Sequence, residues 1–515
     1  MRDQTVLTPV LALLALAALA PVGLRWLRVG QREHYIGGRV GTIAALWLSR
    51  SRTDLVLAAL AALLAVVACV PGLELAAVPA LALAVLLPRG LGIRGRTSSL
   101  SWTARLRRLA IGWLALELVV GALLVLLLGP GAAALAVVGA PLLLDVAMAV
   151  MERVERRLSA PFVAQAQRRL ARIRPQVVAI TGSYGKTSTK GYIAHLLSAT
   201  TAVVASPASF NNRLGLSRAV NDALVEGTEV FVAEMGTYGP GEIRELCELF
   251  PPDVAVITTI GEAHLERMRT HETILRAKSE ITERARAVVL PVDTPELAAL
   301  AERCRAAGKQ VVTVSVEGRD ADVVVDLAGG TVLARTPEGP VTLHVGPGVA
   351  HGVNLGVAVG VALAVGADVT KTEPRLRSLP RAAHRAEVQD TGSGLVVVDD
   401  TYNANPIGAR AALDEAAALA RGRGGRLVVV TPGIVELGHV QRTRNADFAQ
   451  AAAEAGAHLV VVGRTNRAAL VEGAARAQGT VDVVDARPAA VPLATSAAGA
   501  NGVVLYENDL PDHYP

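Results

Sequence analysis

The sequence predicts a multi-pass α-helical membrane region followed by an α/β protein with a phosphate-binding loop. Long Leu/Ala/Val runs are confined to residues 1–175, strand-like and helix-like segments alternate from residue 176, and the first strand ends in the glycine turn Gly182–Ser188. Alternating strands and helices form parallel sheets covered by helices. We expect a membrane domain at 1–158, an interfacial linker at 159–175, a central domain at 176–380 and a last domain at 381–515.

The charges divide the chain at the same place as the hydropathy. Residues 1–175 hold 20 Arg against 8 acidic residues, a net charge of +12, and residues 176–515 hold 31 Lys and Arg against 38 acidic residues, a net charge of −7. An acidic second part disfavours a nucleic-acid-binding domain. A hydrophobic content of 51% excludes full disorder.

Cysteine and lysine are both scarce. Cys69, Cys247 and Cys304 have neither metal-ligand spacing nor the number for a disulfide framework, which fits a reducing compartment for the second part. Only 5 residues are Lys, against 46 Arg. Because the two are not interchangeable, we expect that some lysines are kept for their particular chemistry and that the others are chance.

Five apolar runs predict the membrane segments, at about Thr5–Leu24, Leu55–Val70, Leu73–Pro88, Leu109–Leu128 and Ala132–Val150. The second and third are short for a span of roughly 20 residues, and Pro71-Gly72 between them predicts a tight hairpin. Arginine-rich segments at 25–54, 89–108 and 153–157 belong in the cytoplasm by the positive-inside rule. We expect an external N-terminus, a multi-pass protein of the cytoplasmic membrane and a cytosolic second half.

Two acidic residues, Glu117 and Asp145, lie within these apolar runs. Intramembrane acids are costly, so they face a partner or a cavity, or they serve packing through an interhelical hydrogen bond. The sequence leaves both interpretations open.

The segment that begins at Gln176 has the order of a phosphate-binding loop. Gln176–Thr181 predicts a buried strand, and Gly182–Ser188 leads into a helical stretch. Backbone N–H groups and the helix N-terminus can hold phosphate, Lys186 can reach the terminal phosphates and Thr187 can ligate Mg²⁺. Ile180 stands at the first glycine position of the strict pattern, so this is a variant loop. A chance turn before a helix is the alternative.

Two further strands are predicted at Glu229–Glu234 and Val254–Thr259. Glu234 ends the first and His264 follows the second, where parallel sheets bind ligands. Together they could complete a metal site over the phosphates. Alone, each is more often an ordinary polar residue at the end of a strand.

Six motifs follow one another along the chain: TGSYGKTS, SFNN (Ser209–Asn212), EMGTYGPGEI (Glu234–Ile243), IGEAHLE (Ile260–Glu266), AKSEI (Ala277–Ile281) and DDTYNANP (Asp399–Pro406). This series resembles the Mur ligase family, and within it most closely the MurF branch of UDP-N-acetylmuramoyl-tripeptide–D-alanyl-D-alanine ligases. The similarity covers about residues 176–515.

The resemblance implies a central ATPase domain, a C-terminal Rossmann-like domain and an ATP-dependent acid–amino-acid ligase. ATP would convert a carboxylate into an acyl phosphate, which an amine would attack. Matched by position, the implied catalytic residues are Lys186, Lys278 and His264. The implied ATP-binding residues are Gly182, Ser183, Gly185, Lys186, Thr187, Ser188, Asn354, Arg385 and Asp399. The implied ligands of Mg²⁺ are Thr187, Glu234, His264 and Lys278 as a carbamate.

Lys278 illustrates why a lysine would be kept. A carbamate forms on a primary amine, which Arg lacks, and it would add an anionic oxygen ligand for a second Mg²⁺. The alternative is an ordinary surface cation on a helix.

From about residue 380 a new alternation predicts a second parallel sheet. The expected strands are Leu395–Asp399, Arg426–Thr431, His458–Val462 and Val481–Val484, and the expected helices are Ile407–Ala420 and Gln441–Ala455. Three features depart from the MurF pattern. Membrane segments replace the domain that holds the UDP-linked substrate, Thr431–Gly438 matches the family's GDM.ELG stretch only in part, and Asn445 stands near a family His.

The leading interpretation is a membrane-anchored ATP-dependent amide ligase in peptidoglycan or cell-envelope precursor synthesis. It would join a small-molecule or lipid-linked carboxyl acceptor to an amino acid or dipeptide amine, without nucleic acid. A poly-glutamate-type synthetase is disfavoured by DDTYNANP, and a membrane scaffold with an inactive ligase half is disfavoured by the intact site residues. An ATP-driven transporter would need an ABC-type signature, which the sequence lacks.

Overall fold

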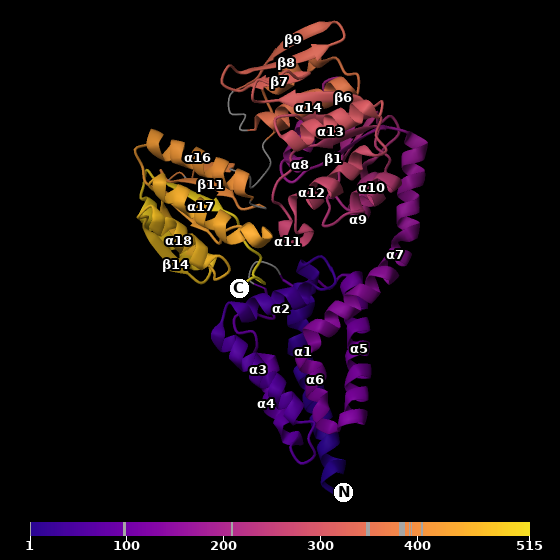
Figure 1. Ribbon diagram of the computed structural model, residues 1–515, viewed down its shortest axis with the longest axis vertical. Coiled ribbons are helices and arrows are strands. Elements are labelled where there is room, and N and C mark those ends of the chain that lie inside the picture. The colour runs from indigo at the N-terminus through magenta and orange to yellow at the C-terminus, as the bar shows by residue number, and fades with distance from the viewer. Residues whose placement is uncertain are drawn as a thin grey trace. The chain divides into compact units, whose positions relative to one another are not determined.

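The chain folds into two compact units. The structure is a computed structural model that describes residues 2–95, 99–207, 210–346, 351–380, 387–390, 392, 394–402 and 405–515 (Figure 1). Unit 1 comprises the chain up to residue 158 together with 463–467 and 509–515, and unit 2 comprises residues 159–462 and 468–508.

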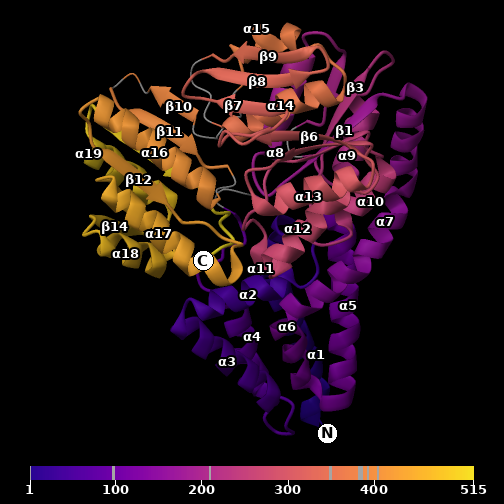
Figure 2. The same ribbon diagram turned by 45° about the horizontal axis from the view of Figure 1, so that its top comes forward.

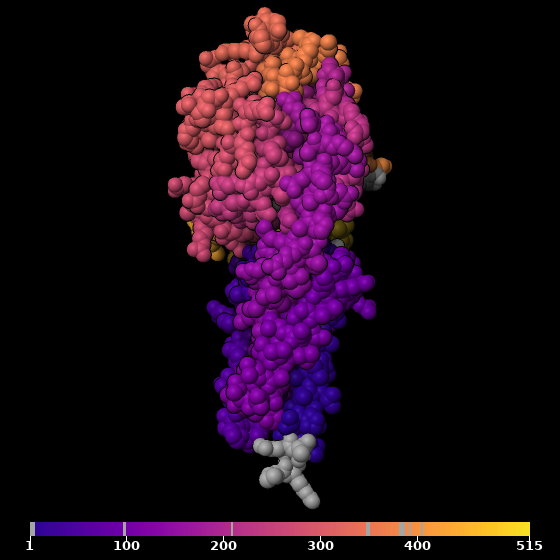
Figure 3. Space-filling model, turned by 90° about the vertical axis from the view of Figure 1, so that its right-hand side faces the viewer, coloured from indigo at the N-terminus to yellow at the C-terminus, as the bar shows by residue number. Residues whose placement is uncertain are grey.

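Unit 1 is an α-helical bundle built from the apolar runs. Trp26, Trp113 and Leu144 are buried in its interior. Side chains of the fifth and seventh helices lie on the face of the unit that Figure 3 shows. Apolar side chains are also exposed, since Leu126 is 81% exposed. The helices are α1 (Arg2–Arg32), α2 (Arg39–Ser49), α3 (Arg52–Val67), α4 (Ala77–Leu86), α5 (Ala104–Leu128), α6 (Ala133–Val138) and α7 (Ala140–Ile173), whose last part belongs to unit 2.

The predicted hairpin is present, since α3 and α4 are antiparallel neighbours with Pro71-Gly72 in the connection. Among the described helices, α1 and α5 are long and apolar enough to cross a membrane, and a third span results if the pair Pro130–Val138 and Ala140–Ile173, bent by 66°, counts as one. Five spans therefore stay a prediction. The expected linker 159–175 is helical as far as Ile173, because α7 continues through it.

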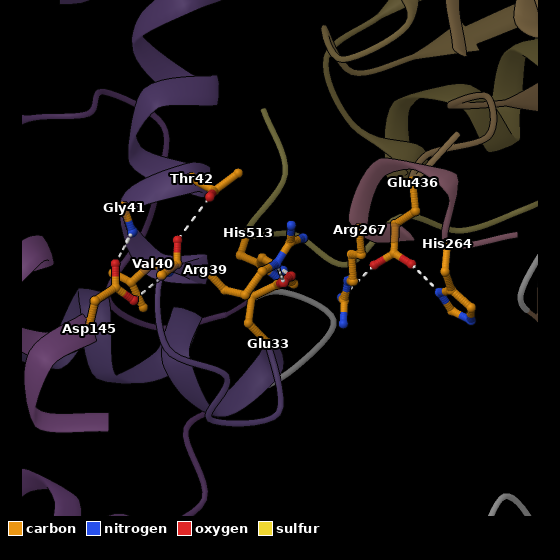
Figure 4. A network of polar contacts seen from close by, with 11 residues as sticks. Glu33, Arg39, Val40, Gly41, Thr42, Asp145, His264, Arg267, Glu436 and His513 are labelled. Carbon is orange, nitrogen blue, oxygen red and sulfur yellow. Dashed lines mark hydrogen bonds and ion pairs between the residues drawn. The ribbon is translucent and has the colours of Figure 1, made fainter. Parts of the chain in front are cut away.

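A tail at the end of the sequence, residues 509–515, is part of unit 1. Asp512 Oδ1 accepts a hydrogen bond from Arg28 Nη1 at 2.5 Å. Figure 4 shows the next contact, in which His513 Nε2 donates to Glu33 Oε1 at 2.9 Å. Trp47 Nε1 donates to the His513 carbonyl oxygen at 2.8 Å. The expected last domain extended to Pro515, whereas the structure groups these residues with the helical bundle.

The first sheet of unit 2 has nine strands in the order β2-β3-β1-β4-β5-β6-β7-β8-β9. It is parallel from β2 to β7 and antiparallel from β7 to β9. Three strands, β1, β3 and β4, coincide with the predicted ones within two residues at each end. The strands are β1 (Gln176–Thr181), β2 (Val203–Ala205), β3 (Val230–Glu234), β4 (Val254–Ile257), β5 (Ala287–Pro291), β6 (Gln310–Ser315), β7 (Val323–Asp326), β8 (Thr331–Thr336) and β9 (Gly339–His344).

Helices cover both faces of this sheet (Figure 2). On one face α8 (Lys186–Leu197) and α14 (Gly352–Ala364) pack on the strands, and α14 is buried nearly all round because its residues are almost all apolar. The other face is covered by α9 (Arg213–Ala223), α10 (Glu242–Leu249), α13 (Pro295–Ala306) and the end of α7. Three further helices are α11 (Leu265–Met268), α12 (His271–Ser279) and α15 (Glu373–Leu376).

The second sheet of unit 2 has six strands in the order β10-β11-β15-β12-β13-β14, and only β10 is antiparallel to its neighbour. One face is covered by α16, α17 and α18, and the other by α19. The four predicted strands and two predicted helices are present, and β10, β15, α18 and α19 are additional. The elements are β10 (Glu387–Asp390), β11 (Val396–Asp400), α16 (Pro406–Gly422), β12 (Leu427–Thr431), α17 (Gln441–Glu454), β13 (His458–Val462), α18 (Arg467–Arg476), β14 (Val481–Val484), α19 (Arg487–Ala498) and β15 (Val503–Glu507).

Candidate active site

The phosphate loop joins β1 to α8 through backbone conformations that favour glycine. Gly182 and Gly185 have φ angles of +152° and +79°, and a Cβ at these positions would lie 1.9 Å from Thr258 Oγ1 and 2.4 Å from Asn354 Oδ1. Among the residues that the structure describes, no side chain caps the N-terminus of α8. A helix start with bare N–H groups next to a glycine turn binds anions such as phosphate.

The loop is fastened to the end of the neighbouring strand β4. Ser183 Oγ donates to the Gly261 carbonyl oxygen at 3.1 Å, and the Tyr184 N–H donates to Thr259 Oγ1 at 3.0 Å. Ser183, which was predicted to bind ATP, therefore fixes the conformation of the loop. Ser188 lies in the first turn of α8, because the helix begins at Lys186 and not after Ser188 as the sequence predicted.

Glu234 is the buried acid at the end of β3, beside the loop. Its Oε2 atom accepts hydrogen bonds from Thr187 Oγ1 at 3.0 Å and from Lys190 Nζ at 2.9 Å. Asn211 Nδ2 lies 3.4 Å from the other carboxylate oxygen. The parallel register of β1 and β3, which pairs Ile180 with Glu234, brings this carboxylate to the loop. The structure thus brings together Thr187 and Glu234, as the sequence predicted.

Two further lysines converge on one atom of the loop. Lys186 Nζ and Lys278 Nζ both donate to the Gly182 carbonyl oxygen, at 2.7 and 3.1 Å. Lys278 is 1% exposed, so the alternative of a surface helix cation is wrong. Burial, and after it the Lys186 ammonium, holds the pKa of Lys278 well below 10.5, which favours its neutral amine.

His264 contacts a glutamate that the sequence did not single out. His264 Nδ1 donates to Glu436 Oε2 at 2.8 Å, and Arg267 Nη2 donates to the other oxygen of that carboxylate at 2.7 Å (Figure 4). Burial lowers the pKa of His264, with Lys278 and Lys186 acting in the same direction and Glu436 against it. A neutral ring that donates from Nδ1 carries its lone pair on Nε2, the form that ligates metals.

Of the predicted nucleotide contacts outside the loop, Asn354 lies against the loop and Asp399 lies in the second sheet. Asn354 is buried at the start of α14, against Gly185. Asp399 accepts hydrogen bonds from the backbone and the hydroxyl of Thr401, at 3.1 and 2.6 Å, in the turn after β11. Arg385 lies outside the described residues.

The donor set at the loop fits a magnesium ion that is shared with phosphate. Mg²⁺ prefers oxygen ligands and is usually held by one or two carboxylates plus substrate phosphates. Thr187 and Glu234 supply a hydroxyl and a carboxylate oxygen next to the anion-binding helix start. Within the described part of the chain, no group of three or more His, Cys, Asp and Glu could hold a metal by itself. A second ion at His264 and Lys278 stays a prediction.

Lys190, Asn211 and Glu436 are contacts of this site to which sequence reasoning gave no role. Lys190 was visible only as one of the five lysines, and Asn211 only as part of the SFNN motif. Glu436 lies in Thr431–Gly438, the stretch that matches the family pattern in part. Nothing local in that stretch indicates a contact with His264, which is 172 residues away in sequence.

Loop, helix start and buried carboxylate define an α/β protein with a loop of the phosphate-binding type, in which a second, mostly parallel sheet follows the first. Residues 180–362 match the Mur ligase middle domain, and residues 384–506 match the Mur ligase, glutamate ligase domain. The chain therefore belongs to the Mur ligase family.

Similar proteins point to one branch of this family. The UDP-N-acetylmuramoyl-tripeptide–D-alanyl-D-alanine ligase of Mycobacterium leprae is 33% identical over 264 residues, which cover 48% of this chain and 51% of that protein. The ligase of the same name from Bacillus subtilis is 31% identical over 270 residues, which cover 52% and 58%. The chain thus spans about half the length of the curated relatives it matches.

Solved structures of MurF enzymes have the same fold as unit 2. MurF from Acinetobacter baumannii superposes with a TM-score of 0.57 at 26% identity and covers 68% of this chain and 77% of that chain. MurF from Thermotoga maritima in complex with ADP gives a TM-score of 0.55 at 26% identity and covers 68% and 80%.

Proposed function

We propose that the chain is an ATP-dependent acid–amino-acid ligase that forms an amide bond in peptidoglycan or cell-envelope precursor synthesis. The observation that carries this proposal is the convergence of Lys186, Lys278, Thr187 and Glu234 on the phosphate loop of a Mur ligase fold. The relatives indicate the type of reaction, since by their names they are ligases that join a tripeptide to D-alanyl-D-alanine.

The reaction begins when an oxygen of the substrate carboxylate attacks the γ-phosphorus of ATP, which forms an acyl phosphate and releases ADP. The amine nitrogen then attacks the acyl carbon, loses a proton and expels phosphate. Because two anions must meet in the first step, cationic groups are needed to offset their repulsion. Lys186, in the loop, supplies one such cation, and a bound Mg²⁺ would screen the phosphates further.

Thr187 and Glu234 would hold this Mg²⁺ between the protein and the phosphates. Lys278 would contribute through a carbamate, for which its burial and its lowered pKa provide a neutral amine. His264 would present Nε2 while Glu436 fixes the ring through Nδ1. Asn354, Asp399 and Arg385 would contact the nucleotide.

The acceptor is a carboxylate on a peptide, either small and soluble or linked to a lipid, and the second substrate is an amino acid or dipeptide amine. In this proposal unit 1 anchors the enzyme in the cytoplasmic membrane with unit 2 in the cytosol. Apolar side chains along α5 support the membrane location, since Ile111 is 70% and Leu126 is 81% exposed. Anchoring raises the effective concentration of the enzyme for substrates near the membrane surface.

Release of ADP by the full-length protein tests the reaction. We expect release that requires Mg²⁺, a peptide acid and an amine together, and a decrease of orders of magnitude in Lys186→Ala, because charge stabilisation of the transition state is usually the largest catalytic term. Lys371→Ala is the matched control, since Lys371 is exposed and paired with Asp368. Wild-type turnover in Lys186→Ala would refute the proposal. Glutamate as the preferred amine would favour a poly-glutamate-type synthetase, and no turnover with any pair would favour an inactive scaffold.

Cysteine labelling in whole cells tests the membrane arrangement. Leu73→Cys lies in the α3–α4 turn and Ser99→Cys in the arginine-rich connection before α5, and both positions are exposed. A membrane-impermeant thiol reagent should label position 73 from outside and position 99 only after lysis. Labelling of position 99 in intact cells would overturn the arrangement.

A further inference from the structure

Three of the five lysines of the chain lie at the phosphate loop, and one of them, Lys190, has no role in the reaction described above. Its Nζ atom is 2.9 Å from Glu234 Oε2, and the two side chains are only 7% and 2% exposed. The pair is therefore a buried ion pair on the same carboxylate oxygen that would ligate Mg²⁺.

We propose that Lys190 is a positioning residue that makes metal binding at Glu234 depend on the nucleotide. Its ammonium holds the carboxylate neutralised and oriented until a divalent ion arrives together with nucleotide phosphates. The inference rests on the nucleotide and magnesium site proposed above.

The geometry fixes the ammonium at this place. Lys190 follows Lys186 by one turn of α8, so the helix that carries the loop lysine also carries the counter-ion of Glu234. The main chain of Glu234 is fixed by its N–H, which donates to Ser206 Oγ at 3.2 Å, and Asn211 Nδ2 lies 3.4 Å from the second carboxylate oxygen. Glu234 therefore has little freedom to turn away from Lys190 when a metal ion approaches.

Charge then decides which species can enter. A divalent ion that binds Oε2 alone lies next to a buried ammonium, and two cations repel strongly where water is excluded. A divalent ion that arrives with a di- or triphosphate brings several negative charges, which offset this repulsion. An unpaired buried Glu234 would also be costly, so the ammonium stabilises the protein before the nucleotide binds.

Binding of Mn²⁺, which replaces Mg²⁺ and is visible by electron paramagnetic resonance, tests the inference on the full-length protein with and without ADP. The wild type should bind Mn²⁺ well only with ADP. Lys190→Met should bind Mn²⁺ without ADP at least tenfold more tightly than the wild type. A merely structural role of Lys190 predicts the opposite, because a disturbed site loses metal.

Further variants complete the test. Lys190→Arg keeps the charge and should bind Mn²⁺ as weakly as the wild type when ADP is absent. The double variant Lys190→Met, Glu234→Gln should lose the increase in Mn²⁺ affinity that Lys190→Met shows. Lys371→Met should behave as the wild type. Two results would overturn the inference. One is Mn²⁺ binding that is unchanged or weaker in both Lys190→Met and a folded Lys190→Gln. The other is an increase in Mn²⁺ affinity in Lys190→Arg that equals the increase in Lys190→Met. ADP binding by Lys186→Ala, measured in parallel, reports separately on the proposed nucleotide site.

Discussion

Glu507, at the end of β15, is a buried acid whose ionisation should weaken the second sheet. Burial raises its pKa to about 8, the charge of Asp400 adds to the rise, and a hydrogen bond from Thr431 opposes it. Glu507 is fully buried, and within the described part of the chain its Oε1 atom has no hydrogen-bond partner. An ionised carboxylate at this position is therefore poorly compensated.

The sign of the pH effect follows from the two pKa values. The unfolded carboxyl titrates near 4.5 and the folded one near 8, so between these pH values the folded protein holds a proton that the unfolded chain has lost. Stability should therefore fall as the pH rises from about 4.5 to above 8. With about 1.4 kcal/mol for each pKa unit, the penalty above pH 8 approaches about 5 kcal/mol.

Glu507→Gln should remove this penalty, because an amide of the same shape stays neutral. We expect the variant to be more stable than the wild type by about 3–5 kcal/mol at pH 9 and to differ by less than about 1 kcal/mol at pH 5. Hydrogen exchange of the β12 and β15 amides in the full-length protein measures this locally. Glu454→Gln, an exposed change on α17, is the control. Equal protection of wild type and Glu507→Gln at pH 9 would refute the reasoning.

Three further outcomes follow from described contacts. Gly185→Ala should weaken ADP binding at least tenfold in calorimetry, because its Cβ would lie 2.4 Å from Asn354 Oδ1 at a φ of +79°, a strain of about 1–3 kcal/mol. Lys278→Arg should be nearly inactive in ADP release, since a guanidinium forms no carbamate and stays charged, and acetate should partly rescue Lys278→Ala. Asp512→Ala should destabilise unit 1 by about 3–5 kcal/mol in detergent, because Arg28, 1% exposed, would lose its carboxylate partner and keep only the Gly92 carbonyl oxygen among the described contacts.

The controls are Gly227→Ala for backbone strain away from the loop, Lys309→Arg for the loss of a lysine elsewhere, and Pro511→Ala for an exposed change in the tail. Tryptophan fluorescence reports on the Asp512 variant selectively, because all four tryptophans lie before residue 158. ADP affinity unaltered in the Gly185 variant, activity in the Lys278→Arg variant, or an unchanged melting curve for the Asp512 variant would each contradict the corresponding prediction.

The local features of this molecule, such as strand limits and turns, could be predicted from the sequence. The β-branched run Gln176–Thr181 has the same limits as β1, and the glycine turn after it has the backbone that the pattern predicts. Thr187 and Glu234, both expected as Mg²⁺ ligands, form a hydrogen bond because β1 and β3 are parallel neighbours that end at one edge of the sheet.

The features that the sequence did not predict are contacts between residues far apart in the chain. The strand β15 inserts between β11 and β12, more than 70 residues after either, and a five-residue apolar run does not say where it will pair. Likewise, the Glu436 carboxylate binds His264 through the packing of two loops. Periodicity reports which face of an element is apolar, but not which loop will lie against it.

The tail, residues 509–515, has a consequence for how the protein is made. Arg28 and Glu33 leave the ribosome early, whereas Asp512 and His513, which neutralise or cap them, follow only after the whole ligase-like part has been synthesised. Until then, among the described contacts, Glu33 can pair with Arg39, and Arg28 with the Gly92 carbonyl oxygen, so the buried Arg28 lacks a carboxylate. A polypeptide that stops short of residue 509 therefore has a less stable helical bundle, which makes it a better substrate for the quality-control proteases of the cell.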